Sequence, residues 1–171
     1  FNQWRRFQFF DKELVKGDAS NAPHQGLLKL KVSAVACGRG HTVFGDDGGW
    51  LTLCDRKFAL TRFQAYQREV QLLCQLQQRN ILVAVGADRA DSVLKVWDLD
   101  SRTDAEGFVA LVPSRNVFEG LGVQREAATC VTAAEDLTLI AVGLASGSVV
   151  ILQGDIRHNK LVSRVISTDR P

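Results

Sequence analysis

The stretch A84-V-G-A-D-R-A-D-S-V-L-K-V-W-D98 holds two apolar segments that flank a short polar turn. Two other stretches repeat its pattern, V43-F-G-D-D-G-G-W-L-T-L53 and A141-V-G-L-A-S-G-S-V-V-I-L152. Each carries a glycine at the same place, and these glycines, Gly45, Gly86 and Gly143, are 41 and 57 residues apart. Alternating apolar residues on both sides of a glycine-containing turn predict a strand, a turn and a second strand in each unit.

A unit of four short strands that recurs about every 40 residues is typical of a β-propeller blade. The dipeptide Trp97-Asp98 is a further feature of the WD40 class of these repeats. We therefore expect an all-β, WD40-like β-propeller. Because closed propellers have about four to eight blades, the three units predict about three blades of an incomplete ring.

The units divide the chain into segments. Residues 1–16 are aromatic-rich and are predicted to form an N-terminal strand that closes the last blade. The other predicted segments are a loop at 17–27, a first blade at 28–67, a second blade with a long loop at 68–127, and a third blade at 128–171. Residues 113–126 are expected to be a surface loop that lengthens the second spacing. The run from Ile81 to Val85 is apolar at every position and is predicted to be a strand buried on both faces. The other predicted strands include His41–Asp46, Trp50–Asp55, Leu60–Tyr66 and Val70–Gln75. We expect the chain to be an excerpt of a longer protein, with the rest of the propeller absent.

The amino-acid composition argues against nucleic-acid binding and against a membrane-spanning helix. The chain has 171 residues, a net charge of +2 and 46% hydrophobic residues, as in an ordinary globular protein with no basic surface for nucleic acid. It has no apolar run long enough for a transmembrane helix. The cysteines lie in or beside apolar runs and are predicted to be small, reduced core side chains, which fits a cytoplasmic location. They are Cys37, Cys54, Cys74 and Cys130.

Motifs that carry chemistry are missing from the sequence. It has no phosphate-binding loop, no C-x-x-C and no H-E-x-x-H, and its histidines, His24, His41 and His158, are scattered. Asp46-Asp47-Gly48-Gly49 is expected to be a tight hairpin turn rather than a calcium loop. The tryptophans Trp4, Trp50 and Trp97 are expected to pack in the blades or to cap strands rather than stack on bases. We predict no catalytic, cofactor-binding or metal-binding residues.

The N-terminal stretch Q3-W-R-R-F-Q-F-F-D-K-E-L-V15 is more specific than the blade pattern. It resembles the start of the vacuolar protein sorting-associated protein 11 family, the class C core subunits shared by the HOPS and CORVET tethering complexes. Further matching features follow in order along the chain. They are C37-G-R-G40, V43-F-G-D46, F63-Q-A-Y66, N80-I-L82, L94-K-V-W-D-L99, A141-V-G143, G147-S-V149 and G154-D-I156.

The resemblance implies a long protein with an N-terminal propeller, an α-solenoid and a zinc-binding RING finger, of which this chain would be the first blades. It implies a non-catalytic protein-interaction scaffold in a multisubunit tether for vesicle docking and membrane fusion. The partners implied are other class C subunits of HOPS and CORVET and the remainder of the same chain, with no nucleic acid and no cofactor in this part. The implied location is cytoplasmic, peripheral on late endosome, lysosome or vacuole membranes.

Two alternatives stay open. One is a generic WD40-like adaptor in another complex, which would have no reason to contain the N-terminal stretch. The other is a propeller enzyme with a site in the central channel, which would need acidic, basic or metal-binding residues on the inner strands. The loop at 100–127 is expected to be the variable contact surface, because it is long and of mixed charge.

Overall fold

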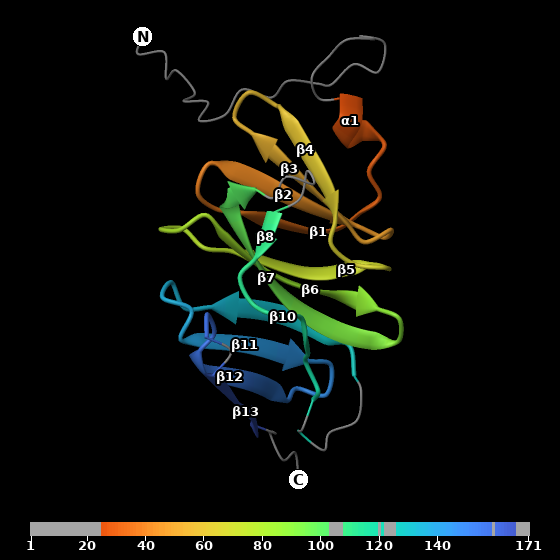
Figure 1. The fold of residues 1–171 in the computed structure, drawn as a ribbon. Coiled ribbons are helices and arrows are strands. Elements are labelled where there is room, and N and C mark those ends of the chain that lie inside the picture. The colour runs from red at the N-terminus through yellow and green to blue at the C-terminus, as the bar shows by residue number, and fades with distance from the viewer. Residues whose placement is uncertain (1–24, 103–107, 120, 122–125, 159, 167–171) are drawn as a thin grey trace, which may run out of the picture.

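The computed structural model describes residues 25–102, 108–119, 121, 126–158 and 160–166. Three antiparallel sheets follow one another along the molecule, in chain order from top to bottom in Figure 1. The one helix among these residues is α1, a single turn at Gln25–Leu28, where the sequence predicted the end of a loop. The all-β class is therefore confirmed. The predicted N-terminal closing strand lies outside the described residues.

The first sheet has the strand order β1-β2-β3-β4. Its strands are Val32–Cys37, His41–Asp46, Trp50–Asp55 and Leu60–Gln64. The predicted hairpin at Asp46 is confirmed: its Oδ1 accepts hydrogen bonds from the backbone N–H groups of Gly48 and Trp50, at 3.0 and 2.9 Å. Gly49 completes the turn with a φ of +82°, a conformation that L side chains rarely adopt.

The first sheet ends earlier than expected, at Gln64 instead of Tyr66. The backbone N–H groups of Ala65 and Tyr66 both donate to the carbonyl of Gly49, at 3.0 Å. The chain thus leaves the strand ladder at Gln64 and folds over the hairpin, which carries the Tyr66 side chain toward the second sheet.

The second sheet has five strands, in the order β5-β6-β7-β8 with β9 paired to β7. Its strands are Val70–Gln75, Ile81–Asp88, Asp91–Arg102, Phe108–Ala110 and Arg115–Asn116. The prediction of a surface loop at 113–126 is wrong in its first part. Arg115 and Asn116 pair with Leu94 and Val93 of β7, and the next two residues, Val117 and Phe118, are buried in the core.

The third sheet has the order β10-β11-β12-β13. Its strands are Ala128–Ala133, Leu139–Leu144, Val149–Asp155 and Lys160–Ile166. The turn predicted within residues 141–152 is present between β11 and β12, and Gly147 in this turn has a φ of +90°. Each of the three sheets therefore begins with four antiparallel strands in sequence order, and the first strand of each sheet lies at one edge.

Each of these first strands carries an irregularity at the same place. The pairing of β1 with β2 shifts by one residue between Val32 and Ala34. The pairing of β5 with β6 shifts between Val70 and Leu72, and that of β10 with β11 between Ala128 and Cys130. The extra residues are Ser33, Gln71 and Thr129. The repeat seen in the sequence is therefore also a repeat of β-bulges, which bend a strand and increase its twist.

The hydrophobic core fills the two spaces between neighbouring sheets. Leu82 and Ala84 of β6 pack with the first sheet, in a cluster that includes Val43, Leu51 and Phe63. Val83 and Val85, on the opposite face of β6, pack with the third sheet. The sequence predicted that the run from Ile81 to Val85 is buried on both faces, and this is confirmed.

Candidate interaction surface

The inner strands of the three sheets, β1, β5 and β10, form one side of the molecule. β5 lies against both β1 and β10. Ser33 Oγ, at the bulge of β1, donates a 2.5 Å hydrogen bond to the carbonyl of Val70, at the start of β5. These strands read VSAVAC, VQLLCQ and ATCVTA, so none of them offers an acid, a base or a histidine. The surface of these three strands therefore has no groups for acid–base catalysis.

A polar cluster connects the first two sheets. The ammonium group of Lys95 lies 2.6 Å from the Asp88 carboxylate, 2.6 Å from the carbonyl of Ala65 and 4.4 Å from the ring centroid of Tyr66. Burial raises the pKa of Tyr66 well above its usual value, and the nearby Asp88 raises it further. Lys95 and Asp88 belong to the second sheet, whereas Ala65 and Tyr66 follow the last strand of the first, so the cluster joins the two sheets.

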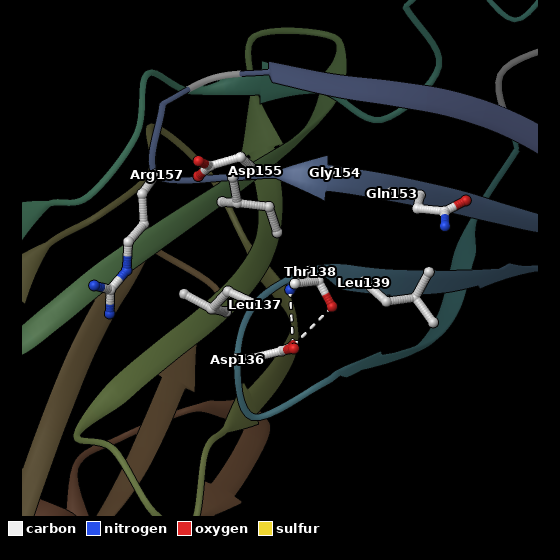
Figure 2. Close-up of a pocket in the computed structure, with 9 residues that line it drawn as sticks. Asp136, Leu137, Thr138, Leu139, Gln153, Gly154, Asp155 and Arg157 are labelled. Atoms are coloured by element: carbon white, nitrogen blue, oxygen red, sulfur yellow. Dashed lines mark hydrogen bonds between the residues drawn. The ribbon is translucent and has the colours of Figure 1, made fainter.

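Figure 2 shows a cleft of about 550 Å³ beside the loop that joins β10 to β11 and the turn that joins β12 to β13. Asp136 Oδ1 accepts from the backbone N–H and the hydroxyl of Thr138, at 3.0 and 2.8 Å. These hydrogen bonds lower the pKa of Asp136, and a hydrogen bond from His158 lowers the pKa of Asp155. Both carboxyl groups are thus held ionised, whereas a general acid at neutral pH needs a raised pKa.

Next to this cleft, one face of the third sheet is apolar and open. The other face packs on the second sheet through Ile140, Val142 and Val150, so the alternate residues point outward. Val162 and Ile166 of β13 are 58% and 54% exposed, and Leu139 of β11 is 40% exposed. We call this surface the third-sheet face. Its register brings together the apolar residues Leu139, Ala141, Val149, Ile151, Val162 and Ile166, and places the polar residues Gln153 and Arg164 on the same face. An apolar surface of this kind marks a contact site.

The predicted burial of the cysteines is correct only in part. Cys54 is buried, Cys74 is half-buried, and Cys37 and Cys130 are exposed. Cys130 points to the third-sheet face, where its Sγ occupies the space in front of Gly143. Alternation along a strand predicts two faces but does not say which face has a neighbouring sheet, and this is why the prediction failed for Cys130.

The histidines and tryptophans named from the sequence lie in separate places within the described part of the chain. His41 begins β2, and His158 Nδ1 lies 2.6 Å from Asp155 Oδ2 in an exposed turn. Trp97 packs edge-on against Phe63 at 5.2 Å, and Trp50 lies under the guanidinium of Arg62 at 4.7 Å, so both pack within the protein as expected. Trp4 and His24 lie outside the described residues. Within the described ranges, no three His, Cys, Asp or Glu side chains are grouped to hold a metal ion.

The expected contact loop at 100–127 is mostly structured where it is described. Residues up to Arg102 continue β7, and β8 and β9 follow within the same segment. Among the described residues, no helix has the length and apolar character needed to cross a membrane.

Solved structures similar to this fold are β-propellers. The propeller domain of Cps50 (Swd1) from Myceliophteria thermophila matches with a TM-score of 0.58 at 15% identity, over 81% of this chain and 44% of that one. Hsv2p from Kluyveromyces lactis matches with a TM-score of 0.54 at 12% identity, over 75% of this chain and 40% of that one. The chain is therefore a β-propeller of the WD40-like type, and the predicted fold class is confirmed.

Sequence comparison defines the family. The family model described as PEP5/VPS11 N-terminal matches residues 4–170. Vacuolar protein sorting-associated protein 11 homologs from Dictyostelium discoideum and Homo sapiens are both 38% identical, over 96% and 92% of this chain. The chain belongs to the PEP5/VPS11 N-terminal family. It spans 17% and 18% of the length of these two relatives.

Proposed function

We propose that this chain is part of a non-catalytic scaffold for vacuolar protein sorting. In this proposal the scaffold belongs to a multisubunit tether of the HOPS and CORVET type, which docks vesicles and supports membrane fusion at endosomes and at the vacuole or lysosome. The observation that supports it most is membership of the PEP5/VPS11 N-terminal family over residues 4–170. Propellers suit this role because a rigid core of sheets holds surface loops in place for protein contacts.

The third-sheet face supports a contact with the remainder of a longer chain. Val162, Ile166 and Leu139 form an open apolar surface on a sheet whose other face is buried. A further sheet packed on this face would bury it in the same way as the second sheet buries the opposite one. Other class C subunits are the proposed external partners, and the complex as a whole would hold the protein on the membrane surface.

The proposed absence of catalysis is supported by the state of the acidic groups. Asp136 and Asp155, in the cleft beside the third sheet, have lowered pKa values, and Lys95 is held by Asp88. The inner strands carry no acidic or basic side chain. These observations favour the scaffold over the propeller enzyme, and the family match favours it over a generic adaptor.

The test is to delete the propeller from the full-length protein and measure three properties. They are co-purification of the other tether subunits, recruitment to endosomal and vacuolar membranes, and fusion activity. We expect at least one of them to fail while the protein level is maintained. A matched variant, Phe58→Ser, changes an exposed apolar residue in the turn between β3 and β4 and should leave all three unchanged. Normal assembly, recruitment and fusion after loss of the propeller would refute the proposal.

A further inference from the structure

Three arginines from three different sheets meet at one open cavity of about 310 Å³. Arg39 lies in the turn between β1 and β2, Arg79 in the turn between β5 and β6, and Arg157 in the turn between β12 and β13. They are far apart in the sequence, and the packing of the sheets brings them together. All three side chains are exposed, so their guanidinium groups can reach a ligand in the cavity.

The three arginines outnumber the two carboxylates, Asp98 and Asp100, that line the same cavity. Arg39 Nη1 donates a 2.7 Å hydrogen bond to the carbonyl of Gln78, which orients the side chain and leaves its other donors available. Among the described residues, no carboxylate lies within 4 Å of any of the three guanidinium groups. The cavity therefore holds three cationic groups with donors to spare.

Two carboxylates in the same cavity are bound by neutral donors. Asp98 accepts from the backbone N–H of Asp100 at 2.9 Å and from the hydroxyl of Ser101 at 2.9 Å. Asp100 accepts from Asn80 Nδ2 at 2.8 Å. Each carboxylate keeps lone pairs that can accept further hydrogen bonds. The cavity thus presents anionic acceptors beside its cationic donors.

The remaining lining is apolar. It consists of Ile81, at the start of β6, and Leu111, after β8. A ligand that fits this cavity needs anionic groups to pair with the arginines, N–H groups to donate to the aspartates, and an aliphatic part to contact Ile81 and Leu111. A peptide with acidic and aliphatic side chains supplies all three, since its backbone provides the N–H groups. A compact polyanion, such as a phosphorylated lipid headgroup, supplies only the first of these three.

We propose that this three-arginine cavity binds an acidic, aliphatic segment of a partner protein. The proposal rests on the proposed scaffold function and adds a site and a chemical class of partner to it. Guanidinium groups suit this role because they bind carboxylates through two parallel hydrogen bonds, which gives specificity as well as attraction.

The experiment measures binding of a fluorescein-labelled peptide, in which glutamate alternates with leucine, to the full-length protein by fluorescence anisotropy. The test variant is the triple substitution Arg39→Gln, Arg79→Gln and Arg157→Gln. Exposed ion pairs contribute little individually, so we expect the affinity of the triple variant to fall by about tenfold. The affinity of the unchanged protein should also fall as salt is added, because exposed charges are screened.

The matched control removes the same charge elsewhere, with Lys29→Gln, Lys57→Gln and Arg89→Gln, which are exposed and do not line the cavity. It should bind the acidic peptide as the unchanged protein does. A peptide with glutamine in place of glutamate should bind weakly to every protein. Far-UV circular dichroism checks that both triple variants are folded.

Three results would overturn the proposal. They are equal loss of peptide binding in both triple variants, equal binding of the glutamine peptide, and binding of vesicles with phosphoinositide headgroups in place of the acidic peptide. Recovery of the tether complex with the test variant is measured separately. If the peptide does not bind but the propeller is still required for assembly, the cavity proposal fails and the scaffold proposal stands.

Discussion

The aromatic ring of Tyr66 lies directly against the backbone of Gly86, so that a Cβ atom at Gly86 would be 2.6 Å from the ring carbons. Tyr66 follows the last strand of the first sheet, and Gly86 lies within β6 of the second. The tyrosine hydroxyl continues past the glycine and donates a 2.8 Å hydrogen bond to the carbonyl of Ala84. The absence of a side chain at Gly86 is therefore what allows the two sheets to approach here.

Replacing Gly86 with alanine should destabilise the propeller by about 1–3 kcal/mol, because the new methyl group overlaps a buried ring that cannot move freely. The midpoint of urea unfolding of the intact propeller measures this. Gly143→Ala is the matched control. There, the only atom closer than 3.4 Å to an added Cβ is the Sγ of Cys130, which is exposed and can rotate away. Equal losses at the two positions would contradict this account.

Tyr66 should make the stability of the protein sensitive to alkaline pH. Its pKa is raised in the folded state, mainly by burial, so the folded protein holds the phenolic proton more tightly than the unfolded chain does. The related stability is fully present below the unfolded tyrosine pKa of about 10 and is lost as the pH rises above that value. Urea midpoints measured from about pH 9 to pH 11 should therefore fall.

The variant Tyr66→Phe separates this effect from other alkaline titrations. It keeps the ring against Gly86 and loses the hydrogen bond to Ala84, which should cost about 1 kcal/mol at neutral pH. Its decline in stability at high pH should be shallower than that of the unchanged protein. An identical decline in both proteins would show that Tyr66 is not the titrating group.

Thiol labelling should distinguish the four cysteines. Cys37 and Cys130 are exposed and should react quickly with a disulfide reagent, whereas Cys54 is buried. Burial raises the pKa of the Cys54 thiol, with a further contribution from Asp55, so both access and thiolate content are reduced. Single-cysteine versions of the 171-residue chain, followed by absorbance at a concentration where light scattering shows no association, would measure each rate. Fast labelling of Cys54 in the folded state would mean that the face of β3 is wrongly assigned.

The same reagent tests what covers the third-sheet face. Cys130 lies on that face, so packing of a further sheet on it should protect this thiol in the full-length protein and leave Cys37 as a comparison. Equal reaction rates for Cys130 in the short chain and in the full-length protein would show that this face stays open.

The 171-residue chain itself should associate in solution, because the third-sheet face is apolar and open. Val162→Lys combined with Ile166→Lys should reduce the association measured by light scattering, since charges on the face oppose burial. Phe58→Lys removes an exposed apolar residue from a turn and should have little effect. Association that is unchanged by the β13 substitutions would place the contact elsewhere on the chain.

Local patterns in the sequence were sufficient to predict most strands and both tight turns. Alternation and glycine placement predicted β2, β3 and β5 with the bounds that the structure has. The short strand Arg115–Asn116 was missed because it follows Pro113 and Ser114, which are typical of loops, and because only pairing with β7 makes it a strand. The three-arginine cavity was missed because its residues are brought together by the packing of sheets, which no local pattern shows.

The shared bulge of β1, β5 and β10 has a consequence for how this chain tolerates insertions and deletions. Ser33, Gln71 and Thr129 have different side chains, so the repeat is conserved between sheets in its backbone path and not in its chemistry. Side chains alternate between the faces of a strand, and each extra residue offsets that alternation by one step. Deleting Ser33 would therefore leave Val32 and Ala34 opposite Asp46 and Gly45, on the faces they occupy now, and would remove the bulge, whereas an extra residue elsewhere in β1 would put one end of the strand out of phase. Changing Ser33 to another residue would leave the phase of the strand intact.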